Sequence, residues 1–171
     1  MATQTVRAMN IAWSPYPYSW ESYEAEESSH KIGAILVWTA SGMVREAEPD
    51  SDGIVGLALQ AGQDKSGSGN VVKTLFAPLV PGTIVEGNLV GSATETSLVV
   101  RATGVGTLVG IIKRTTTGTP WAFDWNEVAQ ANLRFRIVGI RDASGDVNGR
   151  VYAVVVASHT AWAGSNPATA D

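Results

Sequence analysis

Short runs of β-branched and other apolar residues, separated by glycine-bearing turns, recur between residues 32 and 157. Runs of this length are typical of β-strands, whereas a βαβ fold would alternate strands with longer amphipathic helices. In residues 133–141, apolar Phe135 and Ile137 alternate with Arg134 and Arg136, which predicts one buried and one solvated face. The predicted strands are residues 32–38, 43–47, 54–60, 71–78, 83–89, 97–102, 107–114, 121–125, 133–141 and 151–157.

The pattern predicts a mainly β fold, with a small β-barrel or sandwich body over residues 31–157. A short helix is expected at residues 126–132, and residues 142–149 are expected to form a hairpin connection. We expect an extended N-terminal arm at residues 1–30 and a C-terminal tail at residues 158–171. A chain of 171 residues fits one domain with arms, or at most two small units, and no internal repeat is evident.

The predicted N-terminal arm is rich in aromatic residues and contains Pro15 and Pro17, which favour extended backbone. Its aromatic side chains could fold back onto their own domain, or they could insert into a neighbouring subunit or another partner. We favour the second interpretation, because a free arm of this composition would be adhesive. The predicted partner-binding residues are Trp13, Tyr16, Tyr18, Trp20 and Tyr23.

Composition narrows the classes of partner. Hydrophobic residues make up 44% of the chain and charged residues 16%, so much of the surface must be neutral, as close packing against neighbours requires. An ordinary soluble β protein rich in Ser and Thr would show the same composition. The net charge is −4 without a basic cluster, so we expect no nucleic-acid partner.

Charge is unevenly distributed along the chain. Residues 1–52 carry eight acidic and three basic residues, whereas residues 101–171 carry seven basic and five acidic ones. The two ends could complement each other between copies of the chain, or they could simply be solvated. No apolar stretch approaches the roughly 20 residues of a membrane span, and no basic segment leads into an apolar run. We therefore expect no membrane association, and synthesis in the cytoplasm.

Candidate catalytic groups are few. The chain has no cysteine, and His30 and His159 are its only near-neutral bases, with no Gly-x-Ser-x-Gly motif to accompany them. The carboxylate pairs Glu46/Glu48 and Asp50/Asp52 do not have a spacing that establishes a catalytic cleft. No nucleotide-binding glycine motif is present.

The segment from Ser144 to Gly149 resembles the beginning of a calcium loop, but its twelfth position is Val155 and not an acid. A hairpin connection with Asn148-Gly149 in its turn is the better interpretation. We predict no catalytic, metal or cofactor-binding residues.

Two phrases about thirty residues apart carry a resemblance to a known family. The first has the pattern D-x-I-x-G-x-A at residues 52–58, and the second has the pattern P-G-x-x-x-x-G-N at residues 81–88. A strand pair at residues 33–38 and 42–47 precedes them, and residues 134–141 resemble a late strand. Together these segments resemble the decoration, or cement, proteins of tailed-bacteriophage capsids.

The resemblance implies a non-enzymatic virion protein on the capsid exterior that stabilises the shell by clamping neighbouring capsomers. It implies the major capsid protein as partner, and self-association as a homotrimer. The aromatic arm and the tail are not general features of that family. Two other classes remain open: a head-fibre base or receptor-binding knob of a virion, and a small β-barrel enzyme or carbohydrate-binding β module.

Overall fold

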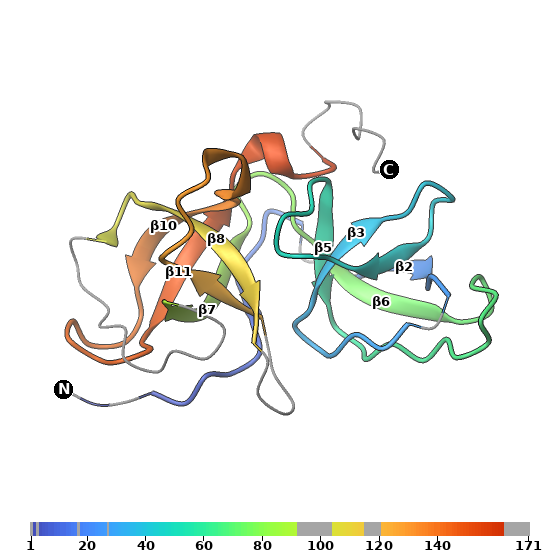
Figure 1. The fold of residues 1–171 in the computed structure, drawn as a ribbon, viewed down its shortest axis with the longest axis horizontal. Helices are drawn as coiled ribbons and strands as arrows, with labels where there is room; N and C mark the ends of the chain where they lie inside the picture. The colour runs from blue at the N-terminus through green and yellow to red at the C-terminus, as the bar shows by residue number, and fades with distance from the viewer. Residues whose placement is uncertain are drawn as a thin grey trace.

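The strands form two β-sheets that lie side by side (Figure 1). The computed structural model describes residues 2, 4–16, 18–26, 28–91, 104–114 and 121–162. The first sheet has the strand order β2-β6-β5-β3-β4, and the second has the order β1-β7-β11-β10-β8-β9. The strands are β1 (Asn10–Trp13), β2 (Trp20–Tyr23), β3 (Ile35–Trp38), β4 (Val44–Glu46), β5 (Ile54–Ala58), β6 (Lys73–Pro78), β7 (Ile84–Val90), β8 (Leu108–Lys113), β9 (Trp121–Asp124), β10 (Phe135–Ile140) and β11 (Arg150–Val155).

The second sheet closes into a five-stranded barrel. Its closure is a parallel pairing between the end of β7 and β9, with Leu89 opposite Phe123 and Val90 opposite Asp124. All other pairings in this sheet are antiparallel. Strand β1 is an addition to the barrel, because it pairs antiparallel with the first part of β7 and with no other strand that the structure describes. The predicted β-barrel is therefore confirmed.

The first sheet has the same topology as the barrel. When β2 to β6 are matched in chain order with β7 to β11, every neighbouring pair corresponds, and every pairing has the same direction. The parallel closure also corresponds: a bridge joins Glu24, just after β2, to Val44 of β4. The fold is thus a tandem of two five-stranded units, although the sequence shows no repeat.

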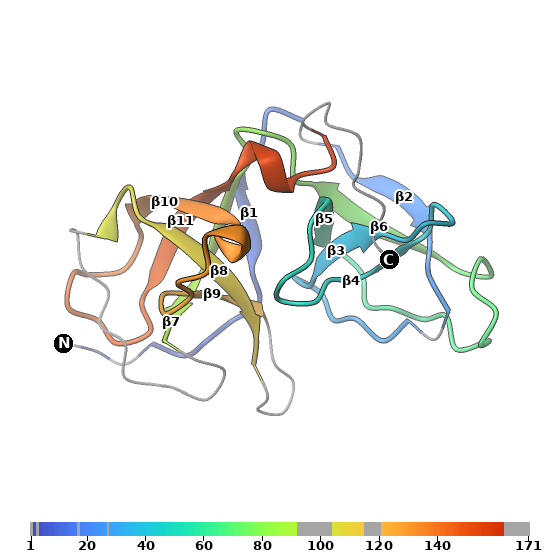
Figure 2. The ribbon, with the colours of Figure 1, turned by 45° about the horizontal axis from the view of Figure 1, so that its top comes forward.

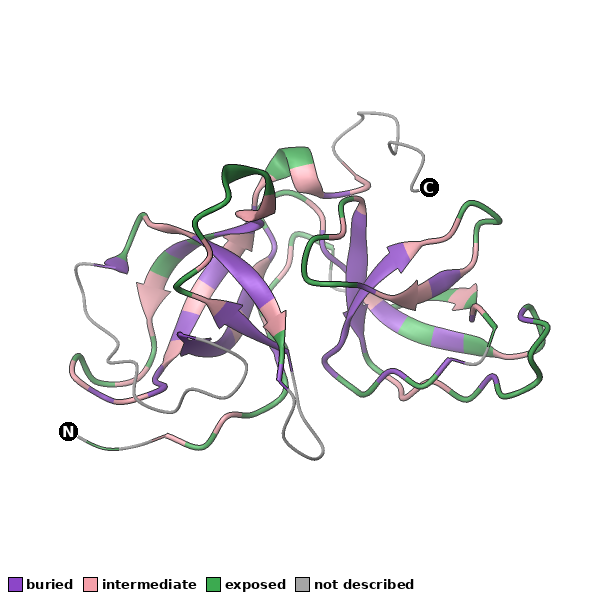
Figure 3. Cartoon of the chain, in the orientation of Figure 1, coloured by how far each residue is buried: buried purple, intermediate pink, exposed green. Residues whose placement is uncertain are grey.

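The two phrases noted in the sequence lead into strands of different units, at positions that do not correspond in the two topologies. Gly53 and Gly82 adopt positive φ angles of 67° and 91°, the left-handed region that glycine enters without steric cost. Their turns lead into β5 and β7, and all five residues of β5 are buried (Figure 3). The phrases therefore place buried strands, one in each unit.

The predicted strands are confirmed within the described residues, with their ends shifted by a few positions. The prediction for residues 97–102 lies outside the described residues. The antiparallel hairpin of β10 and β11 is also confirmed, and Asn148 has a positive φ of 52°. The helix expected at residues 126–132 is wrong except for a 3-10 turn at Gln130–Asn132. There the Asp124 carboxylate accepts the amide of Asn126, a local bond that competes with helix formation.

Both strands of the N-terminal segment belong to the chain's own sheets. Strand β1 pairs with β7 in the barrel, whereas β2 pairs with β6 in the first sheet (Figure 2). The chain returns to the first sheet near its other end, where Thr160 forms a parallel bridge with Ile54. One apolar core cluster includes residues of both units, and Met9 is buried within it.

Candidate functional site

Five exposed aromatic side chains occupy the segment that connects the two units. Trp13 ends β1, Tyr16 and Tyr18 lie in the connection, and Trp20 and Tyr23 begin and end β2. Their exposures range from 42% for Tyr23 to 73% for Tyr18. Because β1 and β2 are hydrogen-bonded into sheets, a paired backbone holds Trp13, Trp20 and Tyr23 in place. The prediction that these five residues bind a partner remains a prediction.

Tyr16 and Trp20 line a groove of about 450 Å³ on the first unit. The other lining residues are Pro78, Val80, Pro81 and Trp162. The rings of Trp20 and Trp162 meet edge to face, with centroids 4.8 Å apart. The groove is therefore walled by aromatic and proline rings from three distant parts of the chain, and none of its lining residues is charged.

Trp162 reaches the groove because the C-terminal segment is bonded to β5. The Thr160 hydroxyl lies 2.7 Å from the Leu79 carbonyl and 3.1 Å from the Ile54 carbonyl. The Trp162 indole N–H donates to the Val55 carbonyl at 2.6 Å, which orients the ring. Sequence reasoning placed Trp162 in a tail and missed this role. The only signal was a tryptophan in a segment otherwise made of small residues.

The remaining predicted residues lie outside this groove. Trp13 lines a smaller hollow of about 270 Å³ on the barrel, together with Ile84, Val138 and Tyr152 among others. Tyr23 lies under the ammonium group of Lys73, which is 5.2 Å from the ring centroid and is paired with Glu21. The structure thus brings Tyr16 and Trp20 together and places Trp13 and Tyr23 apart from them.

Arg134 holds the two units together from the barrel side. The sequence predicted it on a solvated face, and that prediction is wrong: its side chain is 1% exposed, whereas Arg136 is exposed as expected. The Arg134 guanidinium donates to the carbonyls of Ser51, at 2.9 Å, and of Asp50, both in the loop before β5. That loop covers the charge and supplies the acceptors a buried cation needs. Burial lowers the pKa of Arg134, while Asp52 and Asp50 oppose that shift.

Glu46 of the first unit makes a second polar link to the barrel. One of its carboxylate oxygens pairs with Lys113, and the other accepts the indole N–H of Trp121 at 2.8 Å. Acidic groups of the N-terminal part and basic groups of the C-terminal part therefore meet within one chain. Attraction between the acidic part of one copy of the chain and the basic part of another remains a prediction.

The two histidines lie in different places. His30 is fully buried, its Nε2 is 3.3 Å from the Thr74 hydroxyl, and burial lowers its pKa although Glu24 opposes the shift. His159 lies at the junction of the units, with Nδ1 2.6 Å from the Asp52 carboxylate. Within the described residues, no group of three or more His, Cys, Asp or Glu side chains is placed to hold a metal ion. No described helix is long and apolar enough to cross a membrane.

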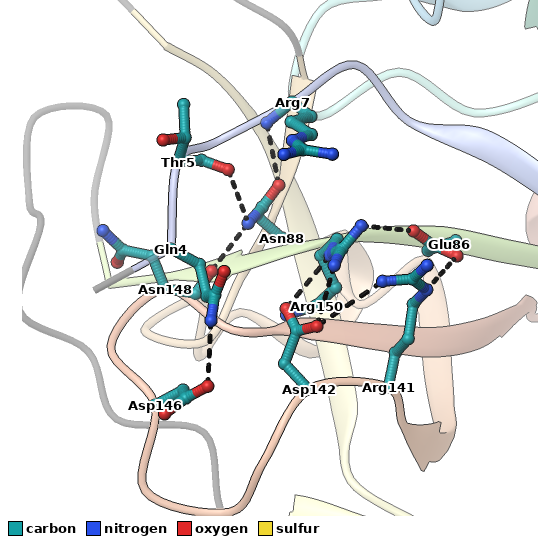
Figure 4. Close-up of polar contacts among 10 residues, drawn as sticks. All are labelled: Gln4, Thr5, Arg7, Glu86, Asn88, Arg141, Asp142, Asp146, Asn148 and Arg150. Atoms are coloured by element: carbon teal, nitrogen blue, oxygen red, sulfur yellow. Dashed lines mark hydrogen bonds and ion pairs between the residues drawn. The ribbon is translucent and has the colours of Figure 1, made fainter. Parts of the chain in front are cut away.

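The hairpin connection anchors the first residues of the chain (Figure 4). The Asp146 carboxylate accepts the Ala2 amide at 2.8 Å and the Gln4 side-chain amide at 2.9 Å, and these bonds lower its pKa. Asn88 accepts the Arg7 amide and donates to the carbonyl of Asn148. Asp146, which lies in the segment that resembled a calcium loop, thus binds the N-terminal segment that leads into β1.

No protein-family model matches this chain, and neither the curated proteins nor the solved structures provide a significant match.

Proposed function

We propose that this protein is a non-enzymatic structural component of a bacteriophage virion, which binds the outside of the assembled capsid and stabilises it by clamping neighbouring capsomers. The observation that carries the proposal is the exposed aromatic surface of Trp13, Tyr16, Tyr18, Trp20 and Tyr23, in which paired strands hold Trp13, Trp20 and Tyr23. Exposed aromatic clusters of this kind are favoured at protein interfaces. The phrases at residues 52–58 and 81–88 add the resemblance to capsid decoration proteins.

The tandem of units suits a clamp. Two units joined through Arg134, Glu46 and the segment leading to Trp162 present one connected body that can contact two neighbouring capsomers. A contact repeated over many positions of a shell accumulates by multivalency, even where each contact is weak. The proposed partners are the major capsid protein and, as a homotrimer, the chain itself.

The test is to mix the purified protein with undecorated capsids, sediment the particles and count the bound copies. Deletion of the N-terminal segment would remove β1 and β2 from the sheets, so substitutions are the sharper tool. Tyr16→Ser combined with Tyr18→Ser should leave the sheets intact, because neither residue lies in a strand. We expect this double variant to bind capsids at least tenfold more weakly than the unmodified protein. Val128→Ser, at an exposed apolar position of the barrel unit, is the matched control and should bind normally. Absence of any binding by the unmodified protein would refute the proposal.

A carbohydrate-binding module is the second candidate, because the rings of Tyr16, Trp20 and Trp162 could stack on sugars. Titration of oligosaccharides against tryptophan fluorescence separates the two functions. A saturable shift that Trp20→Ala abolishes would favour the module.

A further inference from the structure

The loop before β6 has the residue pattern of a calcium-binding loop. Residues 64–71 read Asp-Lys-Ser-Gly-Ser-Gly-Asn-Val, so side chains that carry oxygen stand at the first, third, fifth and seventh positions. The sixth position is Gly69, and calcium loops of the EF-hand type also have a glycine there, for a sharp turn. Gly69 has a φ of 63°, in the left-handed region. Sequence and backbone therefore both match the first part of such a loop.

Three side-chain oxygens of this loop lie close together. The Ser66 hydroxyl donates to Asp64 Oδ1 at 2.6 Å and lies 2.9 Å from the Ser68 hydroxyl. Neighbouring oxygen ligands of one Ca²⁺ are roughly 3 Å apart, because six to eight of them surround the ion at about 2.3–2.6 Å. Hydrogen bonds from Ser66 lower the pKa of Asp64, so this carboxylate is ionised at neutral pH. The loop thus presents one carboxylate and two hydroxyls at the spacing of calcium ligands.

A buried carboxylate from another part of the chain lies against the start of this loop. Glu24, which follows β2, has no exposed surface, and its Oε2 accepts the amides of Gln63 at 2.7 Å and Asp64 at 2.6 Å. Its backbone carbonyl accepts the Asn70 amide at 3.1 Å, so Glu24 is bonded to both ends of the loop. Oε1 of the same carboxylate is buried and has no hydrogen-bond partner among the described residues. Buried charges are normally paired or coordinate a metal ion, and a cation would supply the missing partner.

No basic side chain neutralises the two carboxylates. Within the described part of the chain, neither Glu24 nor Asp64 takes part in an ion pair. The ammonium group of Lys65 donates to the Ser28 carbonyl at 2.6 Å. Burial lowers the pKa of His30 although Glu24 opposes the shift, so this histidine is neutral at pH 7. The negative charge of the pair is therefore available to a divalent cation.

We propose that residues 64–70 and Glu24 together bind a calcium ion, a property that does not rest on the proposed function. The side-chain ligands are the Asp64 and Glu24 carboxylates and the hydroxyls of Ser66 and Ser68. Glu24 takes the place of the acid that closes an EF-hand loop at its twelfth position, which is Leu75 here. Flexible oxygen ligands favour Ca²⁺ over the smaller Mg²⁺, which demands octahedral geometry. With only two charged ligands, we expect a Kd of about 10⁻⁴–10⁻³ M, the weak end for calcium loops.

Isothermal titration calorimetry of the purified protein with calcium chloride tests the proposal, and we expect one saturable site. Glu24→Gln should abolish measurable binding. Ser68→Ala, at an exposed loop position that the fold does not need, should weaken binding at least threefold. Ser41→Ala is the matched control, because its hydroxyl also lies 2.9 Å from another hydroxyl, that of Thr39, in an exposed turn. This control should bind calcium like the unmodified protein.

Amide chemical shifts of isotope-labelled protein locate the ion without any substitution. Calcium should shift the amides of residues 63–71 and of Glu24, and magnesium at the same concentration should shift them less. Shifts confined to residues 142–149 would place the ion in the hairpin connection and overturn the proposal. Absence of saturable binding at about 10 mM calcium, or unchanged affinity in both Glu24→Gln and Ser68→Ala, would also overturn it. Equal affinity for magnesium would overturn the assignment to calcium.

Discussion

At the scale of single residues, buried polar groups hold the loops of the first unit. Glu24 is fully buried, and one of its oxygens accepts the amides of Gln63 at 2.7 Å and Asp64 at 2.6 Å. His30 is buried nearby beside Thr74, and Glu24 opposes the lowering of the His30 pKa that burial causes. A charge placed on His30 would be removed from water, which is why its pKa lies below the usual value.

This shift predicts a pH dependence of stability. The folded state binds a proton on His30 less readily than the unfolded chain does, so stability should fall as pH decreases below the unfolded value of about 6.5. Above that value the contribution is fully present, because His30 is neutral in both states. Urea unfolding at pH 5, 6 and 7 measures the effect, and the fall should be smaller in His30→Gln. A variant as sensitive to pH as the unmodified protein would contradict the assignment to His30.

At the scale of elements, the sequence predicted most strands but not their partners. Glycine turns and β-branched runs are local signals, and β5 and β7 begin where the turns at Gly53 and Gly82 predict. Strand pairing depends on residues far apart in the chain, so the membership of β1 and β2 in separate sheets was not evident from sequence. The same holds for the site: Tyr16 and Trp20 were predicted, but the approach of Trp162 depends on bonds to β5.

Gly56 shows how closely β5 packs against β6. A Cβ at this position would lie 2.4 Å from Cδ2 of Phe76 and 2.5 Å from the Ala77 carbonyl oxygen, so the backbone would have to move. We expect Gly56→Ala to lower the free energy of unfolding by about 1–3 kcal/mol, the usual cost of overpacking a core. Gly139→Ala is the matched strand control, because its Cβ would make only ordinary contacts with Tyr152. Urea unfolding of both variants measures the difference, and equal stabilities would contradict the packing argument.

At the scale of the whole molecule, the two units are joined by more than the chain that connects them. The contacts of Arg134 and of Glu46 cross between the units. The segment from Thr160 to Trp162, which follows the barrel in the chain, binds to β5 of the first unit. Separation of the units would break these links and expose the core cluster that both units share, which favours their unfolding together.

We therefore expect one cooperative unfolding transition, with coincident curves from far-UV circular dichroism and tryptophan fluorescence. Arg134→Ala should lower the free energy of unfolding by about 2–4 kcal/mol, because a buried side chain and its hydrogen bonds to the Asp50 and Ser51 carbonyls are lost. Arg136→Ala, two positions further along the chain and with an exposed side chain, should change stability by less than about 0.5 kcal/mol. Two separate transitions in the unmodified protein would show that the units unfold independently.

The sequence by itself determined that this is a β protein, where most of its strands lie and which aromatic residues are exposed candidates for binding, since turn residues and apolar periodicity act locally. Only the tertiary structure decided that the strands form two units of one topology, that Arg134 is buried, and that Trp162 completes the groove with Tyr16 and Trp20. The physical reason is that these features depend on hydrogen bonds and packing between residues distant in sequence. Two units can therefore share one topology while their sequences show no repeat.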